Sequence, residues 1–339
     1  MFNLKIIQTI KNKIFPFYNN SDLKFVFKKL QEDFPNQSTV AMYVGGCVRK
    51  HLSSEKIDDV DIATILTTDQ IKVKFKDTKF KVIDSGIKHG TVTLVSEKLK
   101  LELTTLRKDI KTDGRHAEIE YTDNWQEDSS RRDFTINAIY LDSNGKIFDP
   151  QLGIVDFKKN LVKFIGDPQK RITEDYLRII RFIRFALEYE SEIEKETVEA
   201  IKLNLNGIKK ISKERIFNEL YKILKIKNFL KLNKKEPLKK IFLLIFPELK
   251  YLERLDKFNT IPDKFFNDKK SLLAILLIDE TNNHEYFLHK YNISNELKDN
   301  LNFIAKNFIN LNKNKNFFQN DLKKNAYYLG KEHLQLLNM

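Results

Sequence analysis

The stretch that decides the fold of this chain is Tyr43-Val44-Gly45-Gly46-Cys47-Val48-Arg49, followed ten residues later by Asp59-Val60-Asp61. Its apolar start predicts a β-strand, and the glycine pair after it predicts a tight turn that opens a helix. The two carboxylates stand at i and i+2 of a second strand, so their side chains leave the same face. Backbone N–H groups in such a turn suit a phosphate, and paired carboxylates suit a divalent cation. The stretch therefore predicts a phosphate cradle beside a metal site.

Two further carboxylates bear on this metal site. Asp58 precedes the pair and points away from it, whereas Glu102 lies on a later strand that could face the pair across the sheet. Carboxylates crowded on an apolar strand are costly unless a cation neutralises them, and Mg²⁺ prefers such oxygen ligands. We predict that Asp59 and Asp61 bind Mg²⁺ and that Glu102 is a third catalytic carboxylate. The alternative is an exposed strand end with solvated acids.

The composition indicates two or three domains with a basic second half. Of the 339 residues, 41% are apolar and 12% aromatic, which suffices for real cores. The net charge of +13 is uneven, because residues 1–150 contribute +2 and the remainder contributes +11. This excess predicts that a long polyanion such as RNA lies along the second half. A solvated lysine-rich surface is the alternative.

The cysteine count and the apolar runs bear on the compartment. The single cysteine, Cys47, excludes an internal disulfide framework and favours a reducing compartment, so we expect a cytoplasmic protein. No apolar stretch reaches about 18 residues, so we expect no membrane span. No group of cysteines and histidines has the spacing of zinc ligands.

The apolar pattern predicts a mixed α/β first half and a helical second half. Residues 22–34 have helical periodicity, and a hairpin around Ser143-Asn144-Gly145 would join two short strands. After Gly166 only two glycines occur in 173 residues and apolar residues recur at three and four, which predicts helices, one of them over residues 172–186. Alternation and β-branched residues predict five main strands, at residues 39–44, 60–64, 80–84, 91–95 and 99–106.

The segment from Ser130 to Ala138 is dense in hydrogen-bonding side chains and is predicted to be a helix. Arg132 could clamp a triphosphate through bidentate bonds, and Asp133 could accept from a ribose hydroxyl. Asn137 follows Asp133 by four residues and would share its helical face. A solvated, salt-bridged helix is the alternative.

A second charged set lies near the start of the helical half. Glu174, Arg178 and Arg181 fall at i, i+4 and i+7 and would line one helical stripe, with Asp175 beside them. A carboxylate next to a guanidinium offers acceptors and donors for the edge of a nucleobase. The alternative is an ordinary ion pair, worth a few tenths of a kcal/mol.

In this order, these segments resemble the tRNA nucleotidyltransferase and poly(A) polymerase family, in its bacterial, class II branch. Four further segments share the family's pattern: His89-Gly90-Thr91-Val92, Asp113-Gly114-Arg115-His116, Asp149 to Asp156, and Ser212-Lys213-Glu214-Arg215. The resemblance covers about residues 40–225. It implies an α+β fold whose polymerase-β-like head has a mixed five-stranded sheet with helices, followed by an all-α neck, body and tail. We place the head at residues 22–155, the neck at 156–225 and the body and tail at 226–339.

The resemblance also implies roles for the residues that match the family's motifs. Asp59 and Asp61 would bind Mg²⁺ and drive attack of the RNA 3′-hydroxyl on the α-phosphate, while residues 107–120 would form a mobile loop. Four positions match the surroundings of the triphosphate: Gly45, Gly46, Arg49 and Arg132. Two positions match the ribose side, Asp133 and Asn137. Three match the protein template that selects CTP and then ATP: Glu174, Asp175 and Arg178. Arg181 and Arg215 match further nucleotide-site or neck positions.

The implied function is addition of CCA to the 3′ acceptor end of tRNA, with CTP and ATP as substrates. The alternatives are a poly(A) polymerase or a partial enzyme that adds only CC or only A, and, more remotely, a non-catalytic RNA-binding protein on the same scaffold. Three positions depart from the common pattern. Lys50 replaces a frequent aspartate, Tyr176 replaces a frequent proline, and Leu152 interrupts a frequent Gly-Gly.

Overall fold

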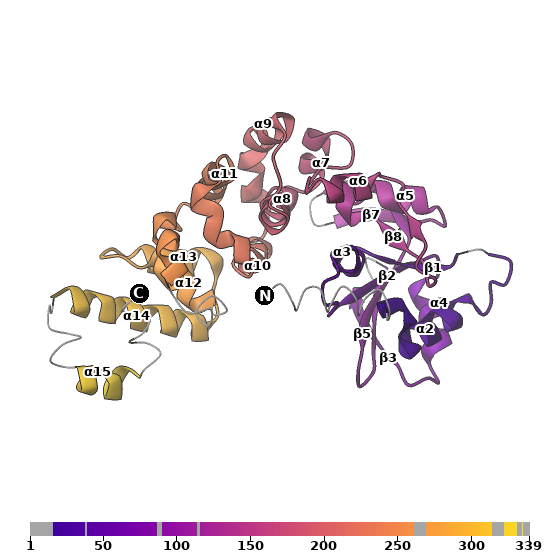
Figure 1. Ribbon diagram of the computed structural model, residues 1–339, viewed down its shortest axis with the longest axis horizontal. Helices are drawn as coiled ribbons and strands as arrows, with labels where there is room; N and C mark the ends of the chain where they lie inside the picture. The colour runs from indigo at the N-terminus through magenta and orange to yellow at the C-terminus, as the bar shows by residue number, and fades with distance from the viewer. Residues whose placement is uncertain are drawn as a thin grey trace. The chain divides into compact units, whose positions relative to one another are not determined.

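A computed structural model describes residues 16–37, 39–86, 90–113, 116–260, 269–313, 322–330 and 334. The chain divides into two compact units between Asp175 and Tyr176 (Figure 1). The first unit contains a mixed sheet and its helices, and the elements described in the second unit are all helical. The predicted α+β class is confirmed. The boundaries proposed after residues 155 and 225 stay predictions.

The sheet of the first unit has seven strands in the order β3-β4-β5-β2-β1-β8-β9. The predicted five-stranded sheet is therefore wrong in number, because the hairpin of β8 and β9 pairs onto its edge through β1. Only β2 and β5 run parallel, and the other pairs are antiparallel. The strands are β1 (Ala41–Val44), β2 (Val60–Thr64), β3 (Lys81–Gly86), β4 (Thr91–Val95), β5 (Lys100–Thr105), β8 (Tyr140–Leu141) and β9 (Ile147–Phe148).

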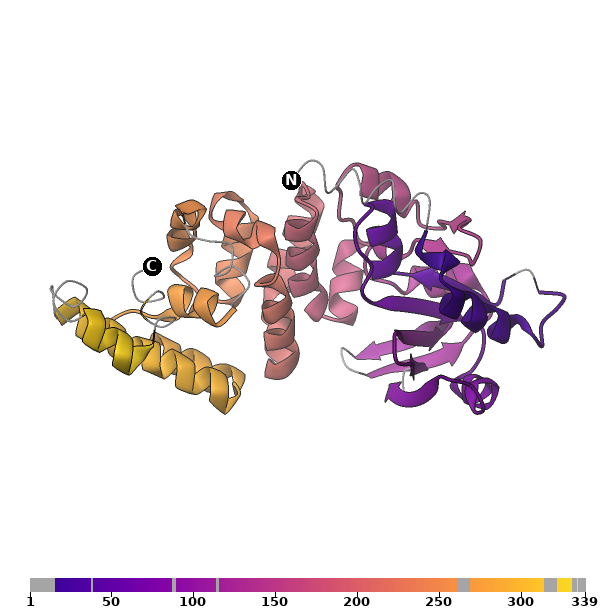
Figure 2. The same cartoon turned by 60° about the horizontal axis from the view of Figure 1, so that its bottom comes forward.

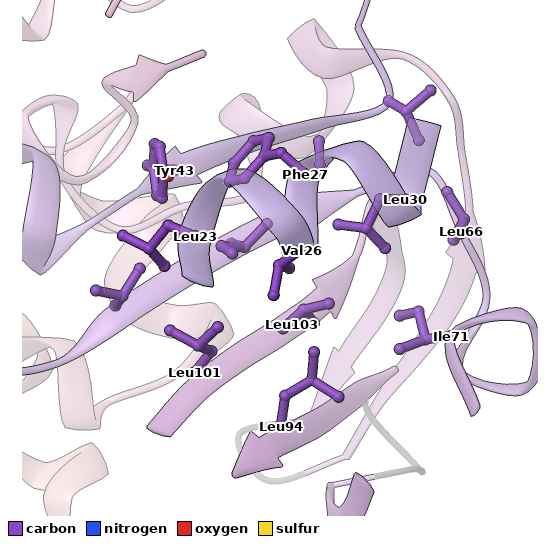
Figure 3. Packing of buried hydrophobic residues seen from close by; sticks show 14 of the residues in the cluster. Leu23, Val26, Phe27, Leu30, Tyr43, Leu66, Ile71, Leu94, Leu101 and Leu103 are labelled. Carbon is purple, nitrogen blue, oxygen red and sulfur yellow. The ribbon is translucent and has the colours of Figure 1, made fainter. Parts of the chain in front are cut away.

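One face of this sheet carries the main core. Helix α2 (Ser21–Gln31) presents buried side chains at i, i+3, i+4 and i+7, as an amphipathic helix does. Helix α4 (Thr68–Phe75) covers the same face, and its Ile71 lies in the same cluster. Figure 3 shows how side chains of α2 meet those of β4 and β5: Leu23, Val26, Phe27 and Leu30 against Leu94, Leu101 and Leu103.

The other face carries a smaller apolar cluster and the candidate site. Because side chains alternate along a strand, burial of Val60 and Ile62 in the main core sends Asp61 to this second face. Burial of Leu101 and Leu103 in the main core likewise sends Glu102 of β5 to the second face. The fold thus leaves the two carboxylates on the face away from α2.

The predicted helix over Ser130–Ala138 is wrong. Helix α5 (Trp125–Ser130) ends before it, and a 3₁₀ turn, η3 (Thr135–Asn137), follows. Between them Phe134 is extended and forms an isolated β-bridge with Phe164. This pairing across 30 residues in the chain overrides the local helical pattern.

The predicted helix over Ile172–Ala186 is also wrong, because it is two helices. Helix α7 (Pro168–Glu174) ends at Asp175, whose φ of −152° and ψ of 106° are extended. Helix α8 (Leu177–Glu188) then begins. Glu174 therefore lies on a different helix from Arg178 and Arg181, and the single stripe predicted for them does not exist.

The segment predicted as a loop contains a two-stranded ribbon. Strands β6 (Arg107–Asp113) and β7 (His116–Tyr121) pair antiparallel. Gly114 and Arg115 of the matching motif lie outside the described residues, as does His89. Helices α3 (Gly46–Leu52) and α6 (Gly153–Lys158) and the 3₁₀ turn η1 (Phe17–Asn19) are the remaining described elements of the first unit.

The second unit begins with α8, in which nine of the twelve residues are buried. Helix α10 packs against α8. Figure 2 shows its helices in colours from pink to yellow. None of the helices in the described part of the chain is long and apolar enough to span a bilayer. The elements after α8 are α9 (Lys195–Asn204), η4 (Leu205–Lys210), α10 (Lys213–Ile223), η5 (Lys227–Lys234), α11 (Leu238–Ile245), η6 (Leu252–Thr260), α12 (Lys269–Leu277), α13 (Asn283–Tyr291), α14 (Asn295–Lys313) and α15 (Leu322–Leu329).

Candidate active site

The predicted carboxylates meet on neighbouring strands. Asp61 of β2 and Glu102 of β5 are register partners in the parallel pair, so their side chains stand next to each other on one face. Asp59 directly precedes β2 and is exposed, like Glu102, whereas Asp61 is half-buried. The structure thus places Asp61 and Glu102 side by side, with Asp59 just before the start of β2.

The charge of Asp61 is suppressed by this arrangement. Burial, which has the largest effect, and the neighbouring charges of Glu102 and Asp59 together raise the pKa of Asp61 to about 6. The guanidinium groups of Arg132 and Arg49 act in the opposite direction. Both predicted phosphate-binding arginines therefore act electrostatically on this carboxylate.

The glycine pair lies over the same carboxylate. Gly45 has a φ of +72°, which L side chains rarely adopt, and a Cβ at this position would lie 3.5 Å from Asp61 Oδ2. Gly46 has open space where its Cβ would be. The Sγ of Cys47 lies 3.2 Å from the carbonyl oxygen of Val44 and 3.6 Å from that of Asp61, so it joins the turn to β2. The backbone here can approach a ligand that also contacts Asp61.

Arg132 is oriented by Asp128, a fully buried carboxylate of α5. Its Nε and Nη2 donate to Asp128 Oδ2 at 3.2 and 2.9 Å, and its Nε also donates to the Tyr140 hydroxyl at 3.0 Å. The other oxygen, Oδ1, accepts from Nε and Nη2 of Arg131 at 2.9 and 2.6 Å. Burial opposes ionisation of Asp128, but Arg132 and Arg131 outweigh it and hold its pKa well below its usual range. The buried anion therefore fixes both guanidinium groups.

A second buried set of hydrogen bonds joins Arg49 to the ribose-side residues. Arg49 Nη1 donates to Asn137 Oδ1, and Asn137 Nδ2 donates to Asp133 Oδ1 at 2.7 Å. The same oxygen of Asp133 accepts from the backbone N–H of Phe134 at 2.9 Å. All three polar side chains are buried. Residues assigned separately to phosphate and ribose are thus one connected network.

Of the predicted base-reading residues, Glu174 is described within the first unit. It accepts from Nη1 of Arg171, and the other terminal nitrogen of Arg171 donates to the backbone carbonyls of Arg131 and Arg132. Asp175 ends this unit. The sequence analysis missed Arg171, although it stands three residues before Glu174, the spacing of an ion pair on a helix.

Arg178 and Arg181 belong to the second unit. Arg178 is buried, and Arg181 Nη1 lies 3.8 Å from Oε1 of the buried Glu219. Arg184 Nε pairs more closely with Glu219 Oε2, at 2.8 Å. The approach of Arg178 and Arg181 to the residues of the first unit stays a prediction.

The carboxylates suit a metal ion that is shared with a substrate. The described residues contain no group of three or more His, Cys, Asp and Glu side chains placed to hold a metal ion. Mg²⁺ commonly uses one or two protein carboxylates and completes its shell with waters and substrate phosphates. Asp61 is half-buried beside its register partner Glu102, and this crowding of carboxylates, which also raises the pKa of Asp61, favours a cation here. Asp59 and Asp61 fit that requirement, and direct contact of Glu102 with the metal stays a prediction.

Residues 41–163 match the family described as the poly A polymerase head domain, and residues 192–252 match the probable RNA and SrmB-binding site of polymerase A. The chain belongs to the class II tRNA nucleotidyltransferase and poly(A) polymerase family. The match to the head domain spans the glycine turn, the carboxylates and the arginine segment, Arg131-Arg132-Asp133. The polymerase-β-like head predicted for the family is confirmed.

Similar members of the family are named as CCA-adding enzymes. The chain is 44% identical over 201 residues to the mitochondrial CCA tRNA nucleotidyltransferase 1 of Mus musculus, which covers 58% of this chain and 46% of that one. It is 33% identical over 277 residues to the CCA-adding enzyme of Staphylococcus haemolyticus, a match that covers 81% of this chain and 66% of that enzyme. The crystal structure of the Bacillus stearothermophilus CCA-adding enzyme in complex with CTP matches 84% of this chain and 69% of that one, with a TM-score of 0.69 and 26% identity. The chain spans about half the length of the mouse relative.

Proposed function

We propose that this protein is a CCA-adding tRNA nucleotidyltransferase, which transfers CMP, CMP and AMP from CTP and ATP to the 3′ end of tRNA. The observation that carries the proposal is the meeting of Asp61 and Glu102 beneath Gly45, within reach of the charges of Arg132 and Arg49. A phosphate cradle, an acidic cluster and two cations in one place are what nucleotidyl transfer requires. The names of the similar proteins supply the substrate.

In this mechanism Asp59 and Asp61 would hold two Mg²⁺ ions, as two-metal catalysis requires: one would lower the pKa of the terminal ribose hydroxyl, and the other would neutralise charge on the departing pyrophosphate. Arg132 keeps its guanidinium fixed on Asp128, so that its charge faces the triphosphate without rearrangement. Asp133 accepts from a ribose hydroxyl. Its Oδ1 is already engaged by the backbone and by Asn137, which fixes the carboxylate plane.

Nucleotide selection depends on hydrogen bonds to the base edge from Asp175 and Arg178, with Glu174 beside them. A base with the wrong donor and acceptor pattern leaves buried polar groups unpaired, at a cost of roughly 1–3 kcal/mol each. The basic second half, with a net charge of +11 after residue 150, would hold the tRNA through its backbone and shape. Affinity for tRNA should therefore fall steeply with salt. We place this activity in the cytoplasm.

The decisive experiment supplies the purified protein with tRNAs that lack A, CA or CCA and offers each nucleotide in turn. We expect two CMP and one AMP to be added, and growth then to stop. A long A tract would identify a poly(A) polymerase, and failure with either CTP or ATP would identify a partial enzyme. The Asp59→Ala, Asp61→Ala double variant should still bind tRNA and should incorporate nothing. Binding of tRNA without any incorporation by the unmodified protein would favour a non-catalytic RNA-binding role.

A further inference from the structure

Among the contacts described above, Arg171 alone joins a predicted base-reading acid, Glu174, to the backbone of the arginine segment. Its side chain is only 11% exposed, whereas that of Glu174 is 31% exposed. Nη1 of the guanidinium donates to Glu174, and Nη2 donates to the carbonyl oxygens of both Arg131 and Arg132. A planar guanidinium makes these bonds through two nitrogen atoms held in a fixed fork, a geometry that the single nitrogen of an ammonium group cannot reproduce.

The arginine segment is held from two sides. Asp128 fixes the side chains of Arg131 and Arg132, and Arg171 fixes their backbone carbonyls. The main chain that follows is anchored as well, because the N–H of Ile165 donates to the carbonyl of Asp133 at 3.1 Å. A shift of Glu174 would therefore be carried through Arg171 to the residues that orient Arg132.

We propose that Arg171 is a positioning residue that couples Glu174 to the arginine segment, so that the fit of the base at Glu174–Asp175 sets the placement of Arg132. In this coupling Asp175 contacts the base, and its neighbour Glu174 carries the effect to Arg171 without a base contact of its own. The inference deepens the proposed function, on which it rests, by assigning selection to a relay within the first unit.

The test measures kcat and KM of Arg171→Lys with CTP, UTP, ATP and GTP on tRNAs lacking CCA or A, together with direct binding of the nucleotides. Lysine keeps the positive charge but has a single nitrogen, so it loses the arrangement in which one nitrogen bonds Glu174 and another bonds the carbonyl oxygens of Arg131 and Arg132. We expect the preference for the correct nucleotide, as a ratio of kcat/KM values, to fall about 2- to 30-fold. The loss should appear mainly in kcat for the correct nucleotide. A purely structural role would lower the melting temperature and leave this ratio unchanged.

Glu174→Gln, alone and combined with Arg171→Lys, tests the relay. If Glu174 acts through Arg171, the double variant should select nucleotides no worse than Arg171→Lys alone. If Glu174 reads the base directly, the two losses will multiply, and the relay is overturned. Because Glu174 is partly exposed, its variant should fold even if Arg171→Lys does not.

Arg254 offers a matched control in the second unit. Its Nη1 donates to the carbonyl oxygens of Ile275 and Ile278 at 2.7 and 2.8 Å, and its guanidinium stacks on Tyr251. Arg254→Lys should lower thermal stability and keep the nucleotide preference. An Arg171→Lys variant that behaves in the same way would overturn the proposal. Absence of any incorporation or nucleotide binding by the unmodified protein would instead overturn the proposed function and, with it, the relay.

Discussion

Asp61 and Glu102 are register partners on the parallel strands β2 and β5, and both side chains stand on the sheet face opposite the main core. Burial and the charge of Glu102 together raise the pKa of Asp61 to about 6. Metal binding needs the ionised carboxylate, so activity should decline as the pH falls through about 6 at subsaturating Mg²⁺. Glu102→Gln removes one repulsive charge and should move this decline to lower pH, as a pH–rate profile at fixed Mg²⁺ will show. An unchanged profile would mean that Glu102 does not act on Asp61.

The same pKa predicts a gain in stability from Asp61→Asn. A carboxyl whose pKa rises from 3.8 to about 6 on folding makes its full contribution to the free energy of unfolding below pH 3.8. That contribution is lost as the pH rises through about 6. At pH 8 without Mg²⁺ the variant should be more stable by about 1–3 kcal/mol, because it no longer buries a charge. It should also incorporate no nucleotide. Denaturant unfolding at pH 4 and pH 8 checks the sign, since the gain should vanish at the lower pH.

The placement of Asp61 and Glu102 could be predicted because it follows from strand alternation. The apolar neighbours Ile62 and Leu103 fix which face each strand buries, and the carboxylates take the other face. The strand positions were found for the same reason. The two short strands of the hairpin were predicted as well, but their pairing onto β1 was not, so the sheet was expected to have five strands instead of seven.

The two wrong helices show what periodicity cannot detect. The spacing of apolar residues stays helical across Asp175, so it does not indicate that Asp175 is extended and separates α7 from α8. At Phe134 the helix is replaced by pairing with Phe164, a contact that no local pattern encodes. The bond between Arg49 and Asn137 joins residues 88 positions apart and depends on the finished fold. By contrast, the pairing of Asp128 with Arg132 has the i, i+4 spacing and could have been predicted.

The two glycines of the turn should respond oppositely to alanine. Gly45→Ala places a methyl group at a φ of +72° and 3.5 Å from Asp61 Oδ2, which should cost about 1–2 kcal/mol of stability. Gly46→Ala lies in α3 with open space around it and should stabilise the helix by about 0.5–1 kcal/mol. Both should weaken CTP binding if the triphosphate approaches this backbone. Melting temperatures and CTP affinity separate the two effects, and normal CTP affinity in Gly46→Ala would place the triphosphate elsewhere.

Asn137→Leu should separate the phosphate and ribose sides of the site. The variant keeps the branched shape of the side chain and loses the amide that bonds Arg49 and Asp133. We expect kcat/KM to fall about 5- to 100-fold, the equivalent of 1–3 kcal/mol for buried polar groups that lose a partner. Discrimination between CTP and dCTP should fall as well. Asn307→Leu is the control, because Asn307 is equally buried and bonds only a carbonyl of its own helix, that of Phe303, among the contacts described. Equal discrimination in both variants would remove Asn137 from the ribose side.

Asp128→Asn should be the most damaging single change near the arginines. The buried carboxylate faces two guanidinium groups and accepts the Tyr140 hydroxyl at 2.8 Å. Loss of its charge should cost about 3–5 kcal/mol of unfolding free energy, because two cations lose their buried counter-ion. Tyr140→Phe removes one hydrogen bond and should cost about 1 kcal/mol.

The control for Asp128→Asn is Asp279→Asn in the second unit. Asp279 also accepts a tyrosine hydroxyl, that of Tyr251 at 2.7 Å, and pairs with Lys250 at 3.0 Å. The unfolding free energy of each variant is measured in denaturant. In a separate assay, the KM of the folded variant for CTP is measured well below its melting temperature. Asp128→Asn should raise the KM, because Arg132 is no longer held toward the triphosphate, and Asp279→Asn should leave it unchanged. A normal KM in Asp128→Asn would show that Arg132 finds its place without the buried anion.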